Sequence, residues 1–527
     1  MQYIPKAIAA DAGGVKTIGL ERWREDFLWP VTNEQVLTFA RFFLDQWAGA
    51  YEGLRGKDRD LLLASIGTCV WFFDHALAGG VRHYCRERGI ALEYSTLARE
   101  IYEPDFAVLA AKPRESMRTL TAGRTRNVLR AAAKNVAFNR GAGAATIVRS
   151  VLGWTDTWGL GSATGFKRDY IRQRGLCCHH LYLSELFPTL PPRGAVSGDL
   201  REAAYAVLRA MADHAHAVWG GSVDVDAALG CWVGTLELLS GVYDTVRAMR
   251  RLPRTILLSE VGQPLHRAIV LAARRRGTRV VGFAHGTPVG NLLELFDSYV
   301  EFAQCDEFVC PTRAMSENFA KVHAMSPLGR LCPVTFDAVG TDRYQKLSAD
   351  YRSRPPIRRV RSAMVMGYPL KAFLGPFIVE ANFFSYQLEV QLHLLDQLRE
   401  FDGEVIYKMH PDTEGESEGI FEGRCQRIVR TPFEQSADEA EAYIFTHIGT
   451  STFGRAVCSN RPVILLQIEG NTWNPDVLPL LSRRCTLIPA RFDERGRIRY
   501  DERMLMDALT REQPDIDYGY VERYFHV

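Results

Sequence analysis

One stretch of this sequence ends an apolar run with two side chains that can carry positive charge. Residues 405–412 read VIYKMHPD, so Lys408 and His410 close a segment that predicts a β-strand. Side chains two residues apart lie on the same side of a strand, and Pro411 stops the strand because it has no backbone N–H to donate. The spacing therefore predicts a strand end that offers two donors to an anion. The alternative is a core histidine beside a lysine whose ammonium reaches solvent.

A second stretch, residues 449–454 with the sequence GTSTFG, predicts a turn that opens a helix. Gly449 permits a tight turn, and Thr450, Ser451 and Thr452 supply hydroxyls where the first N–H groups of a helix lack partners. The helix dipole adds partial positive charge at the same place. Hydroxyls that only cap the helix are the alternative. Because both stretches fall in one region of the chain, we expect them to share a phosphate site.

Residues suited to acid–base chemistry follow apolar runs earlier in the chain. Glu260 comes directly after TILLS, and a carboxylate there could accept a proton from an attacking hydroxyl. His285 precedes Gly286 after TRVVGFA, and glycine lets a ligand approach the backbone closely. Asp74 and Asp169 are further candidates for the same role. A glutamate that caps the next helix and a histidine that holds a turn are the alternatives without catalysis.

Parallel strands would place all of these loops at sheet edges. Apolar runs alternate with amphipathic segments over residues 254–345 and again from residue 362, which is typical of parallel sheets covered by helices. In such α/β folds, ligands bind beyond the carboxyl ends of the strands. We predict two Rossmann-like domains, over residues 1–345 with helical insertions and over 346–505, followed by a closing helix and tail over 506–527.

Three further segments have specific predictions. The apolar run of residues 59–67 predicts a strand, followed by a helix to about residue 88 and a second strand after Gly89. Residues 153–175, in which Gly and Trp alternate with polar residues, predict a loop. Residues 199–250 predict two long helices.

Composition excludes several classes of protein. The 527 residues have a formal net charge of only +2, which argues against a general nucleic-acid binder. Eleven cysteines without a Cys-x-x-Cys pair predict reduced thiols and a cytoplasmic protein. The adjacent Cys177, Cys178, His179 and His180 point in different directions on a strand or helix, which disfavours a zinc site. No long apolar run predicts a signal peptide or a membrane span.

A local excess of positive charge occupies residues 112–154, with nine Lys or Arg residues and Glu115 as the one acid. Arg126, Arg130 and Lys134 have the spacing of one helix face. Such a face would suit an acidic glycan, a lipid phosphate or a membrane surface, so residues 112–149 predict a peripheral membrane contact. A solvated basic helix is the alternative.

The two C-terminal motifs, taken with the earlier His285-Gly286, resemble those of GT-B glycosyltransferases that build bacterial surface polysaccharides. More narrowly, His410-Pro411 and Thr450-Ser451-Thr452 are similar to the HP and S/T motifs of bacterial sialyl-, polysialyl- and Kdo transferases, which hold the CMP part of a CMP-sugar. The resemblance covers roughly residues 254–470. Polyol-phosphate transferases carry a similar His-Pro, but their turn includes an Asp and a Tyr that this chain lacks.

The resemblance implies a GT-B fold and a metal-independent glycosyltransferase of capsule or lipopolysaccharide synthesis at the inner face of the membrane. A CMP-activated ulosonic acid such as Kdo or sialic acid would be the donor, with no other cofactor, and a glycan or lipid-linked glycan the acceptor. The N-terminal domain would bind the acceptor and the second domain the nucleotide-sugar. The implied catalytic residues are Glu260, His285 and His410. The implied donor-binding residues are Gly367, Tyr368, Lys408, Pro411, Glu434, Gly449, Thr450, Ser451 and Thr452. A CDP-polyol phosphotransferase and a non-catalytic nucleotide-sugar-binding assembly protein are the alternatives.

Overall fold

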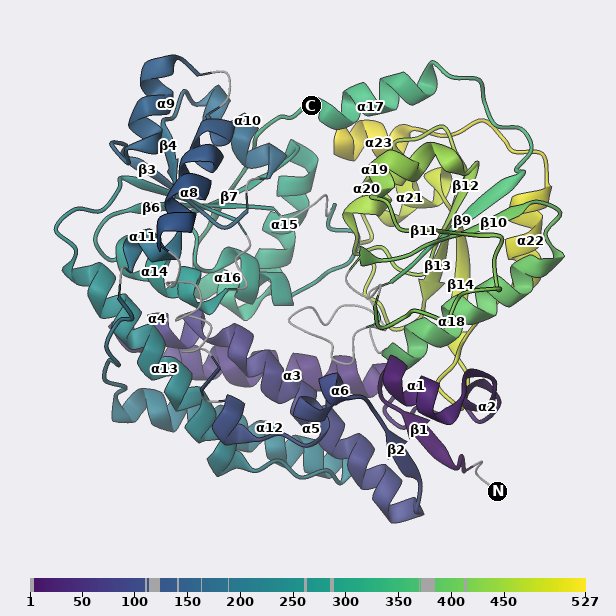
Figure 1. Cartoon of the computed structure of the whole chain (residues 1–527), viewed down its shortest axis with the longest axis horizontal. Helices are drawn as coiled ribbons and strands as arrows, with labels where there is room; N and C mark the ends of the chain where they lie inside the picture. The colour runs from purple at the N-terminus through teal and green to yellow at the C-terminus, as the bar shows by residue number, and fades with distance from the viewer. Residues whose placement is uncertain are drawn as a thin grey trace.

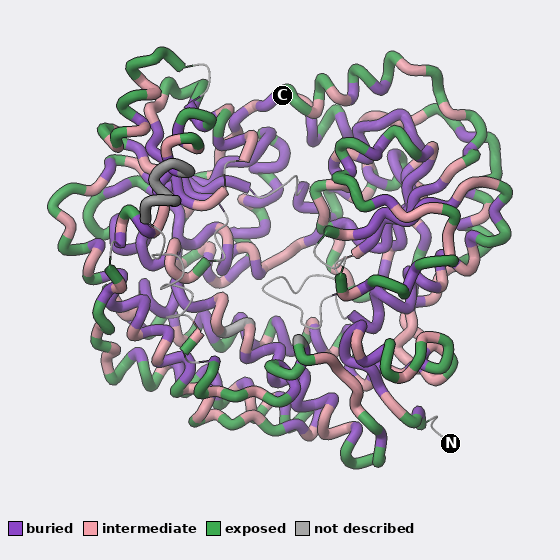
Figure 2. The backbone as a smooth tube through the Cα atoms, in the orientation of Figure 1, coloured by how far each residue is buried: buried purple, intermediate pink, exposed green. Residues whose placement is uncertain are grey.

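The computed structural model describes residues 4–109, 111–112, 124–139, 142–162, 164–187, 189–259, 263–284, 289–368, 370, 384–411 and 415–527. Figure 1 shows two groups of strands and helices side by side, with long helices beneath them. The inner strands of both groups are buried along most of their length (Figure 2). The chain therefore has an α/β fold built on two separate sheets.

The first sheet has six parallel strands in the order β4-β3-β5-β6-β7-β8. Their bounds are β3 (Thr157–Leu160), β4 (Cys178–His180), β5 (Thr255–Leu258), β6 (Arg279–Phe283), β7 (Glu307–Cys310) and β8 (Thr335–Ala338). The chain builds β3 and β4 outward on one side and then reverses to β5. The strand order therefore changes direction between β3 and β5.

The second sheet has seven strands in the order β11-β10-β9-β12-β13-β14-β15, parallel except for β15. Their bounds are β9 (Ser362–Met366), β10 (Glu404–Lys408), β11 (Arg427–Val429), β12 (Ala442–Phe445), β13 (Val463–Ile468), β14 (Thr486–Phe492) and β15 (Ile498–Tyr500). Here the order reverses between β9 and β12. Parallel sheets joined through helices confirm the predicted α/β class.

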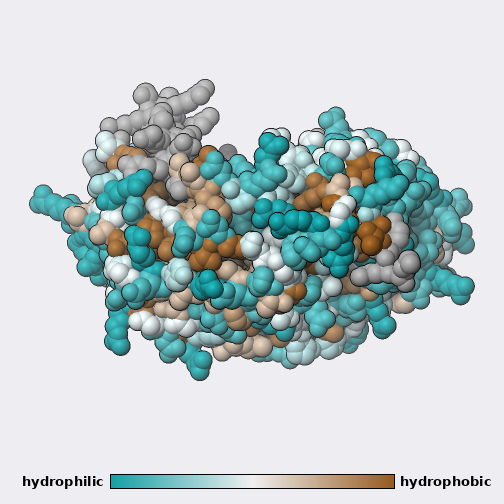
Figure 3. Space-filling model, turned by 90° about the horizontal axis from the view of Figure 1, so that it is seen from below, coloured by the Kyte–Doolittle hydropathy of each residue, from teal (hydrophilic) through white to brown (hydrophobic). Residues whose placement is uncertain are grey.

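Long helices form the layer beneath the sheets in Figure 1: α3 (Asn33–Gly53), α5 (Ile66–Arg88), α12 (Gly198–Trp219) and α13 (Val225–Ala248). The shorter N-terminal elements are β1 (Ala7–Ala9), α1 (Ala12–Ile18), α2 (Leu20–Glu25), α4 (Gly56–Ala64), β2 (Ala91–Glu93) and α6 (Thr96–Tyr102). The two strands β1 and β2 pair in parallel. Viewed from the side of this layer, the surface is mostly hydrophilic with scattered apolar groups (Figure 3).

The remaining helices accompany the two sheets. Around the first sheet lie α8 (Arg124–Phe138), α9 (Ala144–Val151), α10 (Gly165–Gln173), α11 (Leu183–Leu186), α14 (Pro264–Arg274), the π-helix η1 (Ser298–Phe302), α15 (Arg313–Met325) and α16 (Pro327–Leu331). After it follow α17 (Arg343–Arg352), α18 (Phe384–Gln397), η2 (Leu398–Glu400), α19 (Phe433–Ser436), η4 (Ala437–Glu439), α20 (Ser451–Val457), α21 (Leu478–Arg484), α22 (Glu502–Thr510) and α23 (Gly519–Phe525).

Two local predictions are wrong. Residues 59–67 belong to α4 and the start of α5 rather than to a strand, because a short apolar run that is buried all round has no periodicity to separate the two. Residues 153–175 contain β3, an inner strand of the first sheet, and α10, rather than a loop. The predicted strand after Gly89 is β2, and the two helices over residues 199–250 are α12 and α13.

The two ends of the chain pack against opposite sheets. Near the N-terminus, Trp29 N–H donates to the Arg495 carbonyl at 3.0 Å, and the Ala9 carbonyl accepts from Ser385 Oγ at 3.3 Å. At the other end, Thr312 Oγ donates to the Tyr524 carbonyl at 2.6 Å, so α23 contacts the first sheet's helix α15. The domain boundaries at 345 and 505 remain predictions, and these contacts cross both.

Loops that follow one strand of each sheet also meet. Leu293 N–H donates to the Thr472 carbonyl, and Asn474 N–H donates to the Asn291 carbonyl, both at 2.8 Å. Residues 289–297 follow β6 and residues 469–477 follow β13, so the contact joins the carboxyl-end loops of the two sheets.

Among the described residues, α13 is long and apolar enough to cross a membrane, as are α4 and α5 if that bent pair is counted as one span. In α13, 61% of the most apolar window is buried, and the helix packs against α12 and α14. It serves as a core helix of this fold.

Candidate functional site

Three adjacent strands of the second sheet end in register. Met366, the last residue of β9, is paired with Lys408 at the end of β10 and with Phe445 at the end of β12. The strand order reverses between β9 and β12, and the crevice at such a reversal is where α/β sheets bind ligands. The loops that begin after these residues therefore share one edge of the sheet, as the two motifs predicted.

Each of these loops places an aromatic or imidazole side chain two residues beyond its strand: Tyr368, His410 and His447. The rings of Tyr368 and His447 lie edge to face with centroids 4.4 Å apart, which bridges the reversal between β9 and β12. His410, half-buried, is near enough for its charge to act on His447. The edge thus gathers two imidazoles and a phenol ring from three strands.

His447 is the most informative of these residues. Its side chain is 5% exposed, and its Nδ1 has no hydrogen-bond partner in the described structure. Burial, and then the neighbouring His410, lowers the pKa of His447 to about 3, so the ring is neutral at physiological pH. A buried polar atom without a partner is costly, which marks a place where a ligand could supply the missing hydrogen bond.

Two buried glutamines on α18 hold the loops of this edge. Gln391 Oε1 accepts from the Tyr368 N–H at 3.1 Å and from the Tyr407 hydroxyl at 2.7 Å. Gln387 Oε1 accepts from Thr446 Oγ at 3.1 Å, one residue before His447. These contacts fix the backbone on both sides of the crevice. Their signal in the sequence is an i, i+4 pair of glutamines in a helix that also carries Glu389, His393 and Asp396, which does not single them out as site residues.

Lys408 is 6% exposed, and its ammonium donates to the Met409 carbonyl at 2.8 Å. That bond ties the amine to the loop that presents His410. Gly367 is buried, and its N–H donates to the Lys408 carbonyl at 2.9 Å, so β9 and β10 stay paired beyond their ends. A Cβ on Gly367 would lie 2.6 Å from that carbonyl oxygen, and glycine is therefore required for the close approach.

The turn before α20 differs in detail from its prediction. Gly449 is exposed, has no positive φ, and a Cβ added there would meet nothing within 4 Å, so glycine leaves open space rather than enabling a strained turn. Thr450 is the N-cap, and its hydroxyl accepts from Thr452 N–H at 3.3 Å. Ser451 is exposed in the first turn. With only seven residues in α20, the hydroxyls and open space matter more here than the helix dipole.

Two other predicted donor residues lie farther out. Pro411 is exposed directly after His410. Glu434 is exposed in the first turn of α19, which follows the edge strand β11. Its neighbour Phe433 is buried against Tyr443 with ring centroids 5.3 Å apart, so Phe433 belongs to the core.

On the first sheet, the predicted Glu260 and His285 lie outside the described residues. The described part of that edge is tightly filled. The ammonium of the fully buried Lys167 donates to the Leu160 carbonyl at 2.7 Å and to Ser259 Oγ at 3.3 Å, spanning the reversal between β3 and β5. A Cβ on Gly161 would lie 1.7 Å from the Ser259 carbonyl oxygen.

Near this edge, the imidazole of His180 lies close to two lysines. His180, at the end of β4, is 2% exposed and its Nδ1 has no hydrogen-bond partner in the described structure. Burial, and then the charges of Lys167 and Lys134, lowers the pKa of His180 to about 2. The sequence did not predict the role of Lys167 at this edge, because residues 153–175 were expected to form a loop.

The other residues considered for acid–base chemistry or metal binding contact the protein itself. Asp169 forms an ion pair with Arg343 at 2.9 Å, and the buried Asp74 lies on α5 in the helical layer. Among the described residues, no three His, Cys, Asp or Glu side chains gather as a metal site would require. His179 Nδ1 lies 2.7 Å from the Ser150 carbonyl oxygen and its Nε2 lies 3.7 Å from Glu185, so its ring is used locally.

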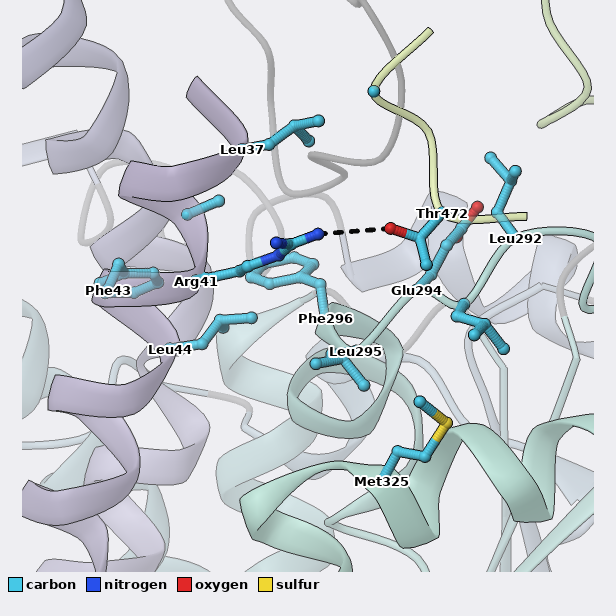
Figure 4. A pocket seen from close by; sticks show the side chains of 13 residues that line it. Leu37, Arg41, Phe43, Leu44, Leu292, Glu294, Leu295, Phe296, Met325 and Thr472 are labelled. Atoms are coloured by element: carbon cyan, nitrogen blue, oxygen red, sulfur yellow. Dashed lines mark hydrogen bonds between the residues drawn. The ribbon is translucent and has the colours of Figure 1, made fainter. Parts of the chain in front are cut away.

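A separate apolar pocket of about 230 Å³ lies where α3 meets the joined loops of the two sheets (Figure 4). Arg41 reaches across it and donates to Thr472 Oγ at 3.3 Å. The lining is otherwise mainly leucine and phenylalanine from α3 and residues 292–296. It lies outside the edge that carries the imidazoles.

No protein-family model matches this chain, and no curated protein matches it either.

Proposed function

We propose that this protein is a glycosyltransferase that moves a sugar from a nucleotide donor, first of all a CMP-activated ulosonic acid, to a bacterial surface glycan. The observation that carries the proposal is the second sheet's edge, where His410 and the buried, partnerless Nδ1 of His447 flank the strand reversal. Donor phosphate bound there would receive hydrogen bonds from groups already held in place.

The anion would be bound by several weak contributions rather than by one strong charge. The half-buried His410 would be the direct phosphate contact, whereas Lys408 holds the His410 loop and adds positive charge from within. Ser451 and Thr452 supply hydroxyls beside the open space at Gly449. Tyr368 and Gly367 would border the nucleoside, with Pro411 and Glu434 at its outer side.

A GT-B arrangement, with two Rossmann-like domains around a shared site, fits the packing of the sheets. Carboxyl-end loops of β6 and β13 are hydrogen-bonded to each other, so the two edges are turned toward a common region. In the proposed reaction the acceptor hydroxyl oxygen bonds to the anomeric carbon while the bond from that carbon to the phosphate oxygen breaks. CMP leaves with the electron pair, and Glu260 or His285 takes the hydroxyl proton.

Two alternative functions would use the same proposed site. A CDP-polyol phosphotransferase would attack phosphorus rather than carbon, and a binding protein of an assembly complex would bind the nucleotide without turnover. The glycosyltransferase is preferred because the Asp and Tyr of the polyol-transferase turn are absent from residues 447–452.

Ligand-induced stabilisation tests the site. We expect CMP to raise the melting temperature more than UDP or GDP does. His410→Ala should weaken CMP binding at least about tenfold, or about 1.4 kcal/mol, and Ser451→Ala should weaken it less. His216→Ala, an exposed histidine on α12, is the matched control and should bind CMP like the wild type.

Turnover separates the three functions. Release of free CMP from a CMP-sugar only when a glycan acceptor is present supports glycosyl transfer, and release of CMP from a CDP-polyol supports the phosphotransferase. Binding without release identifies a binding protein. If His410→Ala and His216→Ala bind CMP equally, or only UDP stabilises the wild type, the proposed donor site is wrong.

A further inference from the structure

Three polar side chains on or directly after helices α8 and α9 are buried against the first sheet. Asn135 Nδ2 donates to the His180 carbonyl at 3.2 Å, and Asn139 Nδ2 donates to the Cys178 carbonyl at 3.0 Å. Ser150 Oγ donates to the same Cys178 carbonyl at 2.6 Å. All three residues are at least 96% buried, and together they bind the two helices to strand β4.

The opposite faces of these helices expose apolar side chains. Val136 on α8 is 45% exposed, Val148 on α9 is 54% exposed, and Leu152 and Trp154 just after α9 are 50% and 67% exposed. Val148 and Leu152 have i, i+4 spacing, and Ala145 and Arg149 on the same side of α9 are also exposed. Ala131 and Phe138 of α8 are buried in the protein, so the exposed apolar side chains form a second apolar surface at this corner, which suits contact with an apolar medium.

The charge of this part of the sequence indicates which kind of apolar medium the corner would contact. Nine of the residues 112–154 are Lys or Arg and one is acidic, whereas the whole chain carries a formal net charge of only +2. Arg149 is exposed and its Nε donates to the Trp154 carbonyl at 3.3 Å, so a positive charge lies beside the apolar side chains. Apolar residues with a tryptophan and flanking basic residues match an interface with anionic lipid headgroups.

We infer that the corner formed by α8, α9 and residues 152–154, here called the α9 corner, docks on a membrane surface that contains anionic lipids. Val148, Leu152 and Trp154 enter the headgroup boundary, while Arg149 contacts lipid phosphates. In Figure 1, α9 lies at the outer edge of the first-sheet group, where a planar surface can reach it. The inference does not depend on which reaction the protein catalyses.

Vesicle flotation tests the inference with the full chain. Vesicles of phosphatidylcholine with phosphatidylglycerol should carry the wild type upward, pure phosphatidylcholine vesicles should carry much less, and high salt should weaken the binding. The double variant Leu152→Ser/Trp154→Ser should bind the anionic vesicles at least about tenfold more weakly, because each side chain loses its apolar burial. Both side chains are exposed, so its melting temperature should stay close to that of the wild type.

The control is Tyr205→Ser/Val218→Ser, which removes two exposed apolar side chains from α12 that are 40% and 38% exposed. This control should float like the wild type, and both double variants should keep their stabilisation by CMP. Equal flotation of the two double variants, or no flotation of the wild type, overturns the inference. A wild type that binds neither vesicle but forms a dimer that Leu152→Ser/Trp154→Ser disrupts also overturns it, in favour of a protein interface.

Discussion

The carboxyl edges of the two sheets have the same topology and opposite contents. In the first sheet, the Lys167 ammonium spans the strand reversal from Leu160 to Ser259, and the backbones at Gly161 and Ser259 touch. In the second sheet, the reversal between β9 and β12 carries the Tyr368 and His447 rings, with open space at Gly449. Each edge has a buried imidazole Nδ1 without a partner in the described structure, His180 at the first and His447 at the second. The edges differ in what accompanies that ring, which is the bridging Lys167 ammonium at the first and the open space at Gly449 at the second.

This difference indicates where an anion can bind. At the first edge, the Lys167 ammonium already donates hydrogen bonds to the Leu160 carbonyl and to Ser259 Oγ. The amine therefore occupies the place of a ligand, and this edge is part of the folding core. At the second edge, His447 is neutral and its buried Nδ1 has no partner in the described structure, beside the half-buried His410. Mutations at the first edge should therefore change the free energy of unfolding, and mutations at the second edge should change ligand affinity.

The largest effect is expected at the filled edge. Lys167→Met removes the bonds to the Leu160 carbonyl and Ser259 Oγ and should lower the free energy of unfolding by about 3 kcal/mol. Chemical denaturation measures this loss, and the rise in melting temperature with CMP should persist. Arg168→Met, an exposed neighbour, is the control and should be nearly neutral. A stable Lys167→Met protein would show that this amine does not hold the first edge together.

A smaller effect, on binding alone, is expected at the open edge. Gly449→Val fills the free space and should weaken CMP binding by about 10- to 100-fold, which is about 1.4–2.7 kcal/mol, with little change in melting temperature. Isothermal titration calorimetry gives the affinity. Gly230→Val, at another exposed glycine with open space, should leave it unchanged. Unaltered binding by Gly449→Val would place the ligand elsewhere.

An effect that depends on pH is expected at His447. The pKa of His447 is about 3 in the folded protein, against 6.5 for an ordinary histidine, so the unfolded chain takes up a proton that the folded protein does not. This contribution favours unfolding as the pH falls from about 6.5 toward 3, by at most about 1.4 kcal/mol per pH unit. His447→Asn should lose less stability than the wild type between pH 6.5 and 4.5 in denaturant titrations, whereas His216→Asn should not differ. Parallel pH profiles of His447→Asn and the wild type would contradict the lowered pKa.

Much of the second sheet could be predicted from the sequence. Strands β9 to β14 were expected because apolar runs of three to seven residues alternate there with helical patterns. The same alternation placed His410 and residues 449–452 at strand ends, and the register of β9, β10 and β12 brings those ends together. The position of a motif at a strand end can be predicted because the order of strands and helices alone determines it.

The remaining residues could not be found that way. His447 lies in a loop, and only the packing of Tyr368 and the bond from Thr446 to Gln387 determine its burial. The role of Lys167 was not predicted because the strand before it, β3, has four residues, too few for a periodic signal. The Gly and Trp residues around β3 are typical of a loop. The α9 corner was recognised by its charge, but that its apolar face points outward depends on three buried polar side chains of α8 and α9.

The crossed packing of the two chain ends has a consequence for synthesis on the ribosome. Residues 9–33 emerge first, but the partners of Ala9 and Trp29 are Ser385 and Arg495, more than three hundred and fifty residues later. Helix α15 likewise waits for Tyr524. The N-terminal segment can pair β1 with β2 early, but its contacts with Ser385 and Arg495 form only after those residues are translated. Separately expressed halves would therefore each expose surface that the other half covers.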